Sequence, residues 1–287
     1  VEGGTEALSS LVDEQEKVEE PPTFRSSTYF DEIYYVRTAE EHLAFEEPFE
    51  WTHPPLGKLI IAVGMASFGF NPFGWRIMGV VFSSLMIPVM YMLAKCLFEG
   101  VRNALLASLL FGFDFMRFTM GRMATVDTFV VFLSLLMYLF FFTYAKGLYK
   151  SGWREAYLPI LLTILCFGLA FSTKWYAFYG FLSVAFLFAM LKLKEYALIR
   201  KGKSSAERDY FLRPILVAFL SLVLAGIAYL TTYLPYIEAG HSLQDVFKLQ
   251  FTMYGFHSGL TASHPFSSAW WTWPFLQRPV WLYYRAL

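Results

Sequence analysis

Long apolar stretches with few charges alternate along the chain with short polar segments. A helix needs about 20 mostly apolar residues to cross the hydrocarbon core of a bilayer, and an open chain in lipid can pair its backbone polar groups only as a helix. With some tolerance in length, six stretches meet this requirement. They cover residues 75–97, 103–120, 126–145, 157–172, 175–191 and 214–236. The pattern therefore predicts an all-α polytopic membrane protein whose six transmembrane helices fill residues 75–236.

The remaining residues form three polar regions. Residues 1–23 are acidic and contain Gly-Gly and Pro-Pro, which is typical of a solvated linker or tail. Residues 24–74 mix aromatic and charged side chains, and we expect an external loop there with a short helix over residues 31–42. The apolar run 59–70 is too short to cross, so its helix would lie in the membrane interface. Residues 237–287 form a second external loop. The absence of an initiator Met and of a secretory signal indicates a fragment of a longer chain.

Composition supports this prediction and narrows the class of function. Of the 287 residues, 56% are hydrophobic, 20% aromatic and only 16% charged, and the mean hydropathy is +0.45. Such a chain is too apolar for an ordinary soluble domain. The formal net charge of zero argues against a strongly basic nucleic-acid-binding protein, so no nucleic acid is expected as a partner. Cys96 and Cys166 both lie in apolar runs, and a disulfide between them is not expected.

Basic residues indicate how the helices are oriented, because cytoplasmic loops carry an excess of lysine and arginine. Three alternate connections are basic. They contain Lys95 and Arg102, then Lys146, Lys150 and Arg154, then Lys192, Lys194, Arg200, Lys201, Lys203, Arg208 and Arg213. If these connections are cytoplasmic, the polar segments 31–58, 121–127, 172–175 and the stretch after Glu238 meet on the opposite face. We therefore expect the chemistry of the protein on its non-cytoplasmic face.

The side chains that meet there suit transfer of a group from a phosphate-bearing lipid. The adjacent carboxylates of Asp31 and Glu32 offer a general base. Arg122 and Lys174 offer fixed positive charge for a phosphate. Further hydrogen-bond donors and flat apolar surfaces for a sugar ring come from His53, His257, His264, Trp270, Trp271 and Trp273.

Each of these residues also has a purely structural interpretation. The Asp-Glu pair could be ordinary solvated surface, Arg122 and Lys174 could be interfacial anchors, and the tryptophans could form an aromatic belt. Asp114 and Arg117 lie three residues apart inside an apolar stretch, which favours an internal salt link. The spacing of the histidines matches no short ligand motif, so we predict no metal site.

Six motifs, taken together and in order, resemble one family. They are Phe-Asp-Glu-Ile-Tyr-Tyr at 30–35, Glu-Trp-Thr-His-Pro-Pro-Leu-Gly-Lys at 50–58, Gly-Trp-Arg at 74–76, Gly-Arg-Met-Ala-Thr-Val-Asp-Thr-Phe at 121–129, Ser-Thr-Lys-Trp at 172–175, and His-Pro-Phe-Ser-Ser-Ala-Trp-Trp-Thr-Trp-Pro at 264–274. From about residue 23 to the end, the chain resembles the protein O-mannosyltransferases, polytopic glycosyltransferases of the GT-C architecture. The resemblance implies a GT-C type transmembrane helix bundle with an external loop that carries short interfacial helices.

The resemblance also implies a reaction. A mannosyl group held on dolichyl or undecaprenyl phosphate would pass to a Ser or Thr hydroxyl of a protein, by a single displacement with inversion. Asp31 would be the base, and Glu32 its neighbour that positions donor or acceptor. Arg122 and Lys174 would stabilise the departing phosphate. We assign further contacts with the donor phosphate or sugar to His53, Lys58, His264 and Trp270. The lipid-linked sugar is a co-substrate, no cofactor is expected, and a metal requirement stays open.

The chain departs from the family pattern at both ends, where further helices are expected before the acidic pair and after Leu287. Only about 28 residues separate Tyr236 from His264, without the soluble insert of eukaryotic members, which points to a prokaryotic member in the plasma membrane. Two other functions stay open. A related transferase could move aminoarabinose or another sugar to lipid A or a glycan. A transporter or flippase would instead need ionisable groups at mid-membrane on broken helices and two similar halves.

Overall fold

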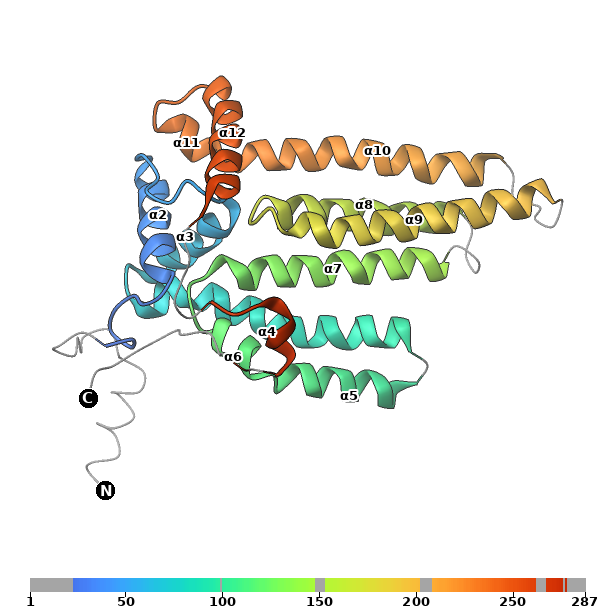
Figure 1. The fold of residues 1–287 in the computed structure, drawn as a ribbon, viewed down its shortest axis with the longest axis horizontal. Helices are drawn as coiled ribbons and strands as arrows, with labels where there is room; N and C mark the ends of the chain where they lie inside the picture. The colour runs from blue at the N-terminus through green and yellow to red at the C-terminus, as the bar shows by residue number, and fades with distance from the viewer. Residues whose placement is uncertain are drawn as a thin grey trace.

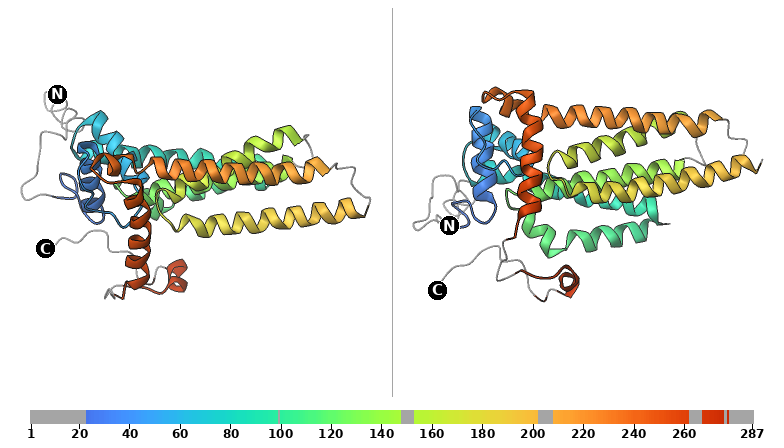
Figure 2. Two further views of the ribbon diagram at one scale, coloured as in Figure 1. Left: turned by 90° about the horizontal axis from the view of Figure 1, so that it is seen from above. Right: turned by 45° about the horizontal axis from the view of Figure 1, so that its top comes forward.

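The computed structural model describes residues 23–98, 100–147, 153–201, 208–261, 267–275 and 277. Every regular element within these residues is a helix, which confirms the predicted all-α class. The long helices lie side by side along one axis (Figure 1). They are α4 (Pro72–Leu97), α5 (Val101–Gly112), α7 (Val126–Gly147), α8 (Trp153–Phe171), α9 (Ala177–Arg200) and α10 (Arg208–Thr231). In the view from above, α9 lies to one side of the other long helices (Figure 2).

Shorter helices gather mainly at one end of this bundle, which we call the site end (Figure 1). They are α2 (Glu32–Ala44), α3 (Leu56–Phe68), α6 (Phe115–Met120), α11 (Leu234–Glu238) and α12 (Leu243–Gly259), followed by the 3-10 helix η2 (Trp270–Phe275). The helices expected over residues 31–42 and 59–70 correspond to α2 and α3. The helix α12 crosses the site end at a steep angle to α10 (Figures 1 and 2).

Four of the described helices are long and apolar enough to cross a membrane, namely α4, α7, α9 and α10. The helix α5 and residues 157–171 of α8 are apolar but shorter, as is α3. These lengths and compositions are those of a multi-pass membrane protein.

The expected helix over residues 103–120 is in fact two helices, α5 and α6, separated at Phe113 and Asp114. Asp114 is the N-cap of α6, and its carboxylate accepts a hydrogen bond of 2.7 Å from the backbone N–H of Arg117. The Arg117 guanidinium instead donates to the carbonyls of Phe111 and Gly112 at the end of α5, at 3.0 and 2.6 Å. The expected salt link between Asp114 and Arg117 is therefore replaced by a helix cap, because both side chains satisfy backbone groups freed by the break.

Two helix ends also differ from the sequence prediction. The helix α9 continues to Arg200 instead of ending at Leu191, because Lys192 pairs with Glu195 one turn later at 2.8 Å and keeps the charges within the helix. The helix α10 ends at Thr231 instead of at Tyr236, and a short separate helix, α11, begins at Leu234.

Backbone contacts join the polar segments at the site end, as the sequence predicted. The N–H of Leu56 donates to the carbonyl of Ser172 at 3.0 Å. The N–H of Ala124 donates to the Glu32 carboxylate at 2.8 Å. The ends of α4, α7 and α9, which carry Lys95, Lys146 and Arg200, all lie at the other end of the bundle (Figure 1). The convergence of the polar segments at the site end is confirmed. The side of the membrane on which each end of the bundle lies stays a prediction.

Gly57, at the start of α3, packs tightly against the bundle. A Cβ atom there would lie 2.6 Å from Cγ1 of Val126 and 2.8 Å from Cγ2 of Thr173. Only glycine allows α3 to approach both the start of α7 and the α8–α9 turn this closely. This contact brings the loop that contains His53 against the segments that contain Asp127 and Lys174.

Replacing Gly57 by alanine is expected to destabilise the protein by about 1–3 kcal/mol, because the added methyl group overpacks this contact. The matched control is Gly226→Ala in α10, where an added Cβ meets no atom within 4 Å. Alanine is there favoured by helix propensity, by about 1 kcal/mol. Thermal unfolding in detergent should give a lower melting temperature for Gly57→Ala alone. Equal melting temperatures for Gly57→Ala and the wild type would contradict the contact.

Candidate active site

The adjacent carboxylates of Asp31 and Glu32 have opposite environments. Glu32 is fully buried in the first turn of α2. Its two oxygens accept hydrogen bonds of 2.8 Å from Nε and Nη2 of Arg76 in α4, and a third of 2.8 Å from the N–H of Ala124. The carboxylate of Glu32 therefore joins α2, α4 and the segment before α7, and is not free to take a proton from a substrate.

Asp31 accepts no side-chain hydrogen bond from any residue that the structure describes, and it lies at the N-terminus of α2 without capping it. Burial raises the pKa of its carboxyl above the ordinary range, and Asp127 and Glu50 raise it further. Lys174 and His53 act in the opposite direction without cancelling the shift. An unpaired carboxylate with a raised pKa has the properties required of a general base.

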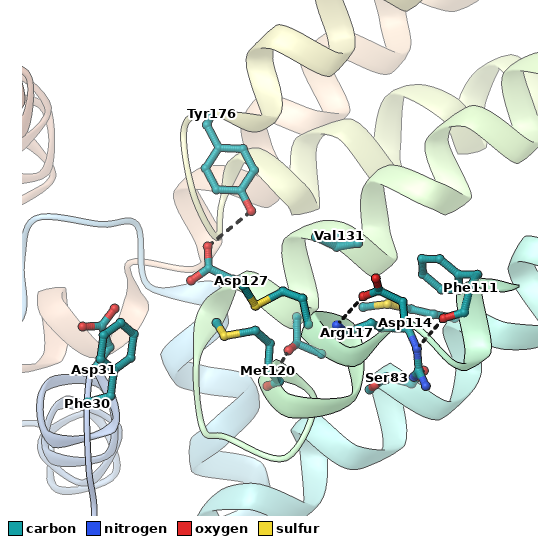
Figure 3. A pocket seen from close by; sticks show the side chains of 13 residues that line it. Phe30, Asp31, Ser83, Phe111, Asp114, Arg117, Met120, Asp127, Val131 and Tyr176 are labelled. Carbon is teal, nitrogen blue, oxygen red and sulfur yellow. Dashed lines mark hydrogen bonds between the residues drawn. The ribbon is translucent and has the colours of Figure 1, made fainter. Parts of the chain in front are cut away.

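Asp31 lines a cavity of about 520 Å³ that opens at the site end (Figure 3). We call it the acidic cavity, because the polar groups that line part of it include the carboxylates of Asp31, Asp127 and Asp114. The rest of the lining is mainly apolar and comes from α4, α5, α6 and α7. It includes Met86, Phe111, Met116, Met120 and Val131. The cavity thus runs from the carboxylates of Asp31 and Asp127 to a mainly apolar groove between α4, α5, α6 and α7, where Asp114 and Arg117 lie (Figure 3).

Asp127, at the start of α7, holds the ammonium group of Lys174. The Lys174 Nζ lies 3.0 and 3.1 Å from the two carboxylate oxygens, and the hydroxyl of Tyr176 donates to one of them at 3.4 Å. An ammonium group has three N–H donors. Lys174 therefore keeps one donor for a further acceptor while its position beside Asp31 is fixed.

Lys58 is fully buried and has no donor left for a ligand. Its Nζ donates to the carbonyl of Glu50 at 2.6 Å, to Oε2 of Glu50 at 2.7 Å and to the carbonyl of His53 at 2.8 Å. Although burial acts to raise it, the pKa of Glu50 is lowered by Lys58 and by the hydrogen bond from His53. Lys58 and Glu50 thus form a buried ion pair that shapes the loop before α3.

His53 is held by Glu50, one member of this ion pair. Its Nδ1 lies 2.9 Å from Oε1 of Glu50, and its Nε2 has no hydrogen-bond partner among the described residues. Its ring lies 5.3 Å from that of His257 in α12, measured between centroids. His257 in turn contacts the carbonyl of Thr52 at 2.8 Å. The loop and α12 therefore leave one ring nitrogen of His53 available to a ligand.

The structure separates Arg122 from the other predicted cations. Arg122 is exposed and lines a different cavity, described below, which Asp31 and Lys174 do not line. Trp270 begins η2, and His264 lies outside the described residues. Within the described residues, no group of three or more His, Cys, Asp or Glu side chains could hold a metal ion.

Sequence reasoning missed three residues on which the site depends: Arg76, Glu50 and Asp127. A lysine at the start of an apolar helix needs a buried partner, which could have pointed to Glu50 as the partner of Lys58. An acidic residue in the first turn of a helix complements the helix dipole, so Asp127 was unremarkable on local grounds. Its pairing with Lys174 joins residues 47 positions apart, and no local pattern indicates it.

A family model described as dolichyl-phosphate-mannose-protein mannosyltransferase matches residues 52–229, more than half of the chain. The chain belongs to this mannosyltransferase family. The match begins in the loop that holds His53 and ends in α10, so it includes Asp127 and Lys174.

Relatives of known name cover most of the chain. The polyprenol-phosphate-mannose–protein mannosyltransferase of Mycolicibacterium smegmatis is 27% identical over an alignment 315 residues long, which covers 90% of this chain and 59% of that protein. The mannosyltransferase of that name from Mycobacterium tuberculosis is 25% identical over an alignment 278 residues long, which covers 79% of this chain and 51% of the relative. The chain therefore spans little more than half the length of these relatives.

A solved structure has the same fold. The S. cerevisiae protein O-mannosyltransferase Pmt1-Pmt2 complex, bound to the sugar donor, matches 75% of this chain and 31% of that chain, with a TM-score of 0.64 and 19% identity. This likeness shows that the fold is a GT-C type helix bundle, as the resemblance implied.

Replacing Glu32 by glutamine is expected to destabilise the protein by about 3–5 kcal/mol, because it leaves the Arg76 guanidinium without its buried counter-charge. Asp31→Asn is the matched control at the adjacent position, since Asp31 has no side-chain partner to lose and asparagine is an equally good N-cap residue. Thermal unfolding at neutral pH should show a lower melting temperature only for Glu32→Gln. A larger loss for Asp31→Asn would contradict the assignment of the two carboxylates.

The raised pKa of Asp31 predicts a pH dependence of stability. The folded protein disfavours the ionised carboxyl, which costs stability at neutral pH, and this cost disappears as the pH falls through the raised pKa. Asp31→Asn carries no such group, so its stability relative to the wild type should be highest near neutral pH and should fall toward about pH 4. Melting temperatures of both proteins across this range test the shift. A difference that does not change with pH would show an ordinary carboxyl.

Proposed function

We propose that the whole protein transfers a mannosyl group from a polyprenyl-phosphate donor to Ser or Thr hydroxyls of proteins. The observation that carries this proposal is the unpaired Asp31 carboxylate on an acidic cavity that continues into an apolar groove. A sugar transfer from a lipid carrier needs a base beside a groove for the lipid. Membership of the mannosyltransferase family and the names of the relatives support mannose and protein as the partners.

Asp31 removes the proton from the acceptor hydroxyl as the hydroxyl oxygen attacks the anomeric carbon. The bond from that carbon to the phosphate oxygen breaks, and the configuration inverts in this single displacement. Because burial raises the pKa of Asp31, its carboxylate is a stronger base than that of a solvated aspartate. Glu32 does not act on the substrate in this scheme, and instead positions the start of α2 through Arg76.

Lys174 stabilises the departing phosphate, and His53 contacts the sugar of the donor. The Lys174 ammonium keeps one N–H that the described residues leave unused. Because Nδ1 of His53 donates to Glu50, its Nε2 can accept a hydrogen bond from a sugar hydroxyl. Charge on the phosphate grows as the sugar bond breaks, so donors fixed in advance act more strongly on the transition state than on the bound donor. Asp127 holds Lys174 in place, and Glu50 holds His53.

The apolar groove accommodates the first isoprene units of the carrier. Three methionines line it, and their flexible side chains can adapt to an irregular hydrocarbon chain. We place the acidic cavity on the external face of a prokaryotic plasma membrane, because the basic connections lie at the opposite end of the bundle.

The test uses the full-length protein in membranes, with radiolabelled polyprenyl-phosphate mannose and a Ser/Thr-rich peptide. Asp31→Asn should lower peptide labelling by about 10²–10⁴-fold, because it removes the base and keeps the shape. The matched control is Glu40→Gln, an exposed carboxylate on the same helix, which should leave labelling unchanged. Label on a lipid or glycan in place of the peptide would support the related sugar transferases. Bound donor without any labelled product would contradict an enzyme.

A further inference from the structure

A second cavity, of about 700 Å³, is lined by Arg76, the partner of Glu32, and not by Asp31. We call it the basic cavity. Three arginines from separate segments line it, namely Arg25 before α2, Arg76 in α4 and Arg122 between α6 and α7. Its lining contains no acidic residue. The acidic cavity, in contrast, contains three aspartates.

Among the described residues, the positive charge of the basic cavity is balanced only in part. The charge of Arg76 is offset by Glu32, but Arg25 and Arg122 form no ion pair with any described residue and are both exposed. The Arg122 guanidinium lies over the Phe118 ring, 5.3 Å from its centroid. Arg25 and Arg122, which have no acidic partner among the described residues, thus line the same basic cavity.

Arg76 keeps a donor for a ligand even while it holds Glu32. Its Nε and Nη2 are used by Glu32 and by the carbonyl of Ser27. Its Nη1 makes only a long contact of 3.5 Å with the carbonyl of Arg25. A guanidinium carries five N–H donors, so the Nη1 group can still donate to a phosphate oxygen.

The basic cavity continues onto the membrane-facing surface of the bundle. Its apolar side is formed by Pro72, Phe73, Ile77 and Val80 in the first turns of α4, which as a whole is long and apolar enough to cross a membrane. Phe73 and Val80 are 48% and 41% exposed. Arginine donors above an exposed apolar strip at a helix start match a lipid that has an anionic headgroup and a hydrocarbon tail.

We propose that the basic cavity binds the phosphate group of an anionic membrane phospholipid, separately from the donor at Asp31. The phosphate accepts hydrogen bonds from Arg25, Arg122 and Nη1 of Arg76, and the acyl chain lies along Phe73, Ile77 and Val80. The same phosphate chemistry could be supplied by the polyprenyl carrier or by free phosphate, so the experiment distinguishes these sources. The proposal does not depend on the transferase reaction, because its readout is lipid retention.

The test measures how much phosphatidylglycerol stays bound to the purified full-length protein. The protein is released from nanodiscs that are made of phosphatidylcholine and phosphatidylglycerol, and the bound lipid is detected by native mass spectrometry. The double variant Arg25→Gln, Arg122→Gln should retain about tenfold less phosphatidylglycerol than the wild type. The control Arg102→Gln removes an exposed arginine at the other end of the bundle and should retain as much as the wild type. Arg122→Lys, which keeps the charge, should retain most of the lipid.

Competition identifies the source of the phosphate. Displacement of the retained lipid by added phosphatidylglycerol, but not by equimolar polyprenyl phosphate or by inorganic phosphate, supports the proposal. Displacement by polyprenyl phosphate would overturn it and assign the basic cavity to the carrier. Equal retention by the wild type and the double variant would overturn it as well, provided that their melting temperatures in neutral detergent agree.

Discussion

The site depends above all on one buried carboxylate, that of Glu32. Removing a carboxylate from water is costly, and the cost is offset only where geometry and hydrogen bonding are good. Here two bonds from Arg76 and one from the Ala124 N–H meet that condition. Because these partners belong to α4 and to the segment before α7, α2 can occupy one position only. Asp31, one residue earlier, is thereby held at the acidic cavity without needing a hydrogen bond of its own.

A second buried ion pair, Glu50–Lys58, fixes the position of the loop before α3. Apolar contacts between lipid-facing helices are weakly directional, and several arrangements of such helices have similar energies. Polar groups that must be satisfied are more selective, since few positions satisfy all donors at once. The three acceptors of Lys58 and the close approach at Gly57 together set the loop on α7 and on the α8–α9 turn. The positions of His53 and Lys174 therefore follow from buried charges more than from apolar packing.

The contrast between apolar packing and buried ion pairs explains which features could be predicted from the sequence. The long helices follow from apolar runs, and the gathering of the polar segments at one end follows from the basic loops. The break at Asp114 was missed because an apolar run of the right length conceals a helix cap. Asp31 and Glu32 are chemically alike neighbours, and only Arg76, 44 residues beyond Glu32, distinguishes them. Lys58 was expected to bind the donor because its buried partner, Glu50, has no local signature. Ion pairs between distant segments leave no periodic pattern to read.

The placement of the cations shows how the two cavities are kept distinct. Arg122 precedes α7 and Lys174 lies in the α8–α9 turn, and each was expected to contact the same phosphate. In the structure Lys174 pairs with Asp127, which lines the acidic cavity, while Arg122 lines the basic cavity and has no ion pair with a described residue. In the Glu32–Arg76 pair the carboxylate comes from α2, and the guanidinium comes from α4 and lines the basic cavity. Because Glu32 uses Nε and Nη2 of Arg76, the Nη1 group can meet an anion without displacing the carboxylate. The Arg76 guanidinium can therefore line the basic cavity while Glu32 keeps α2, and with it Asp31, in position.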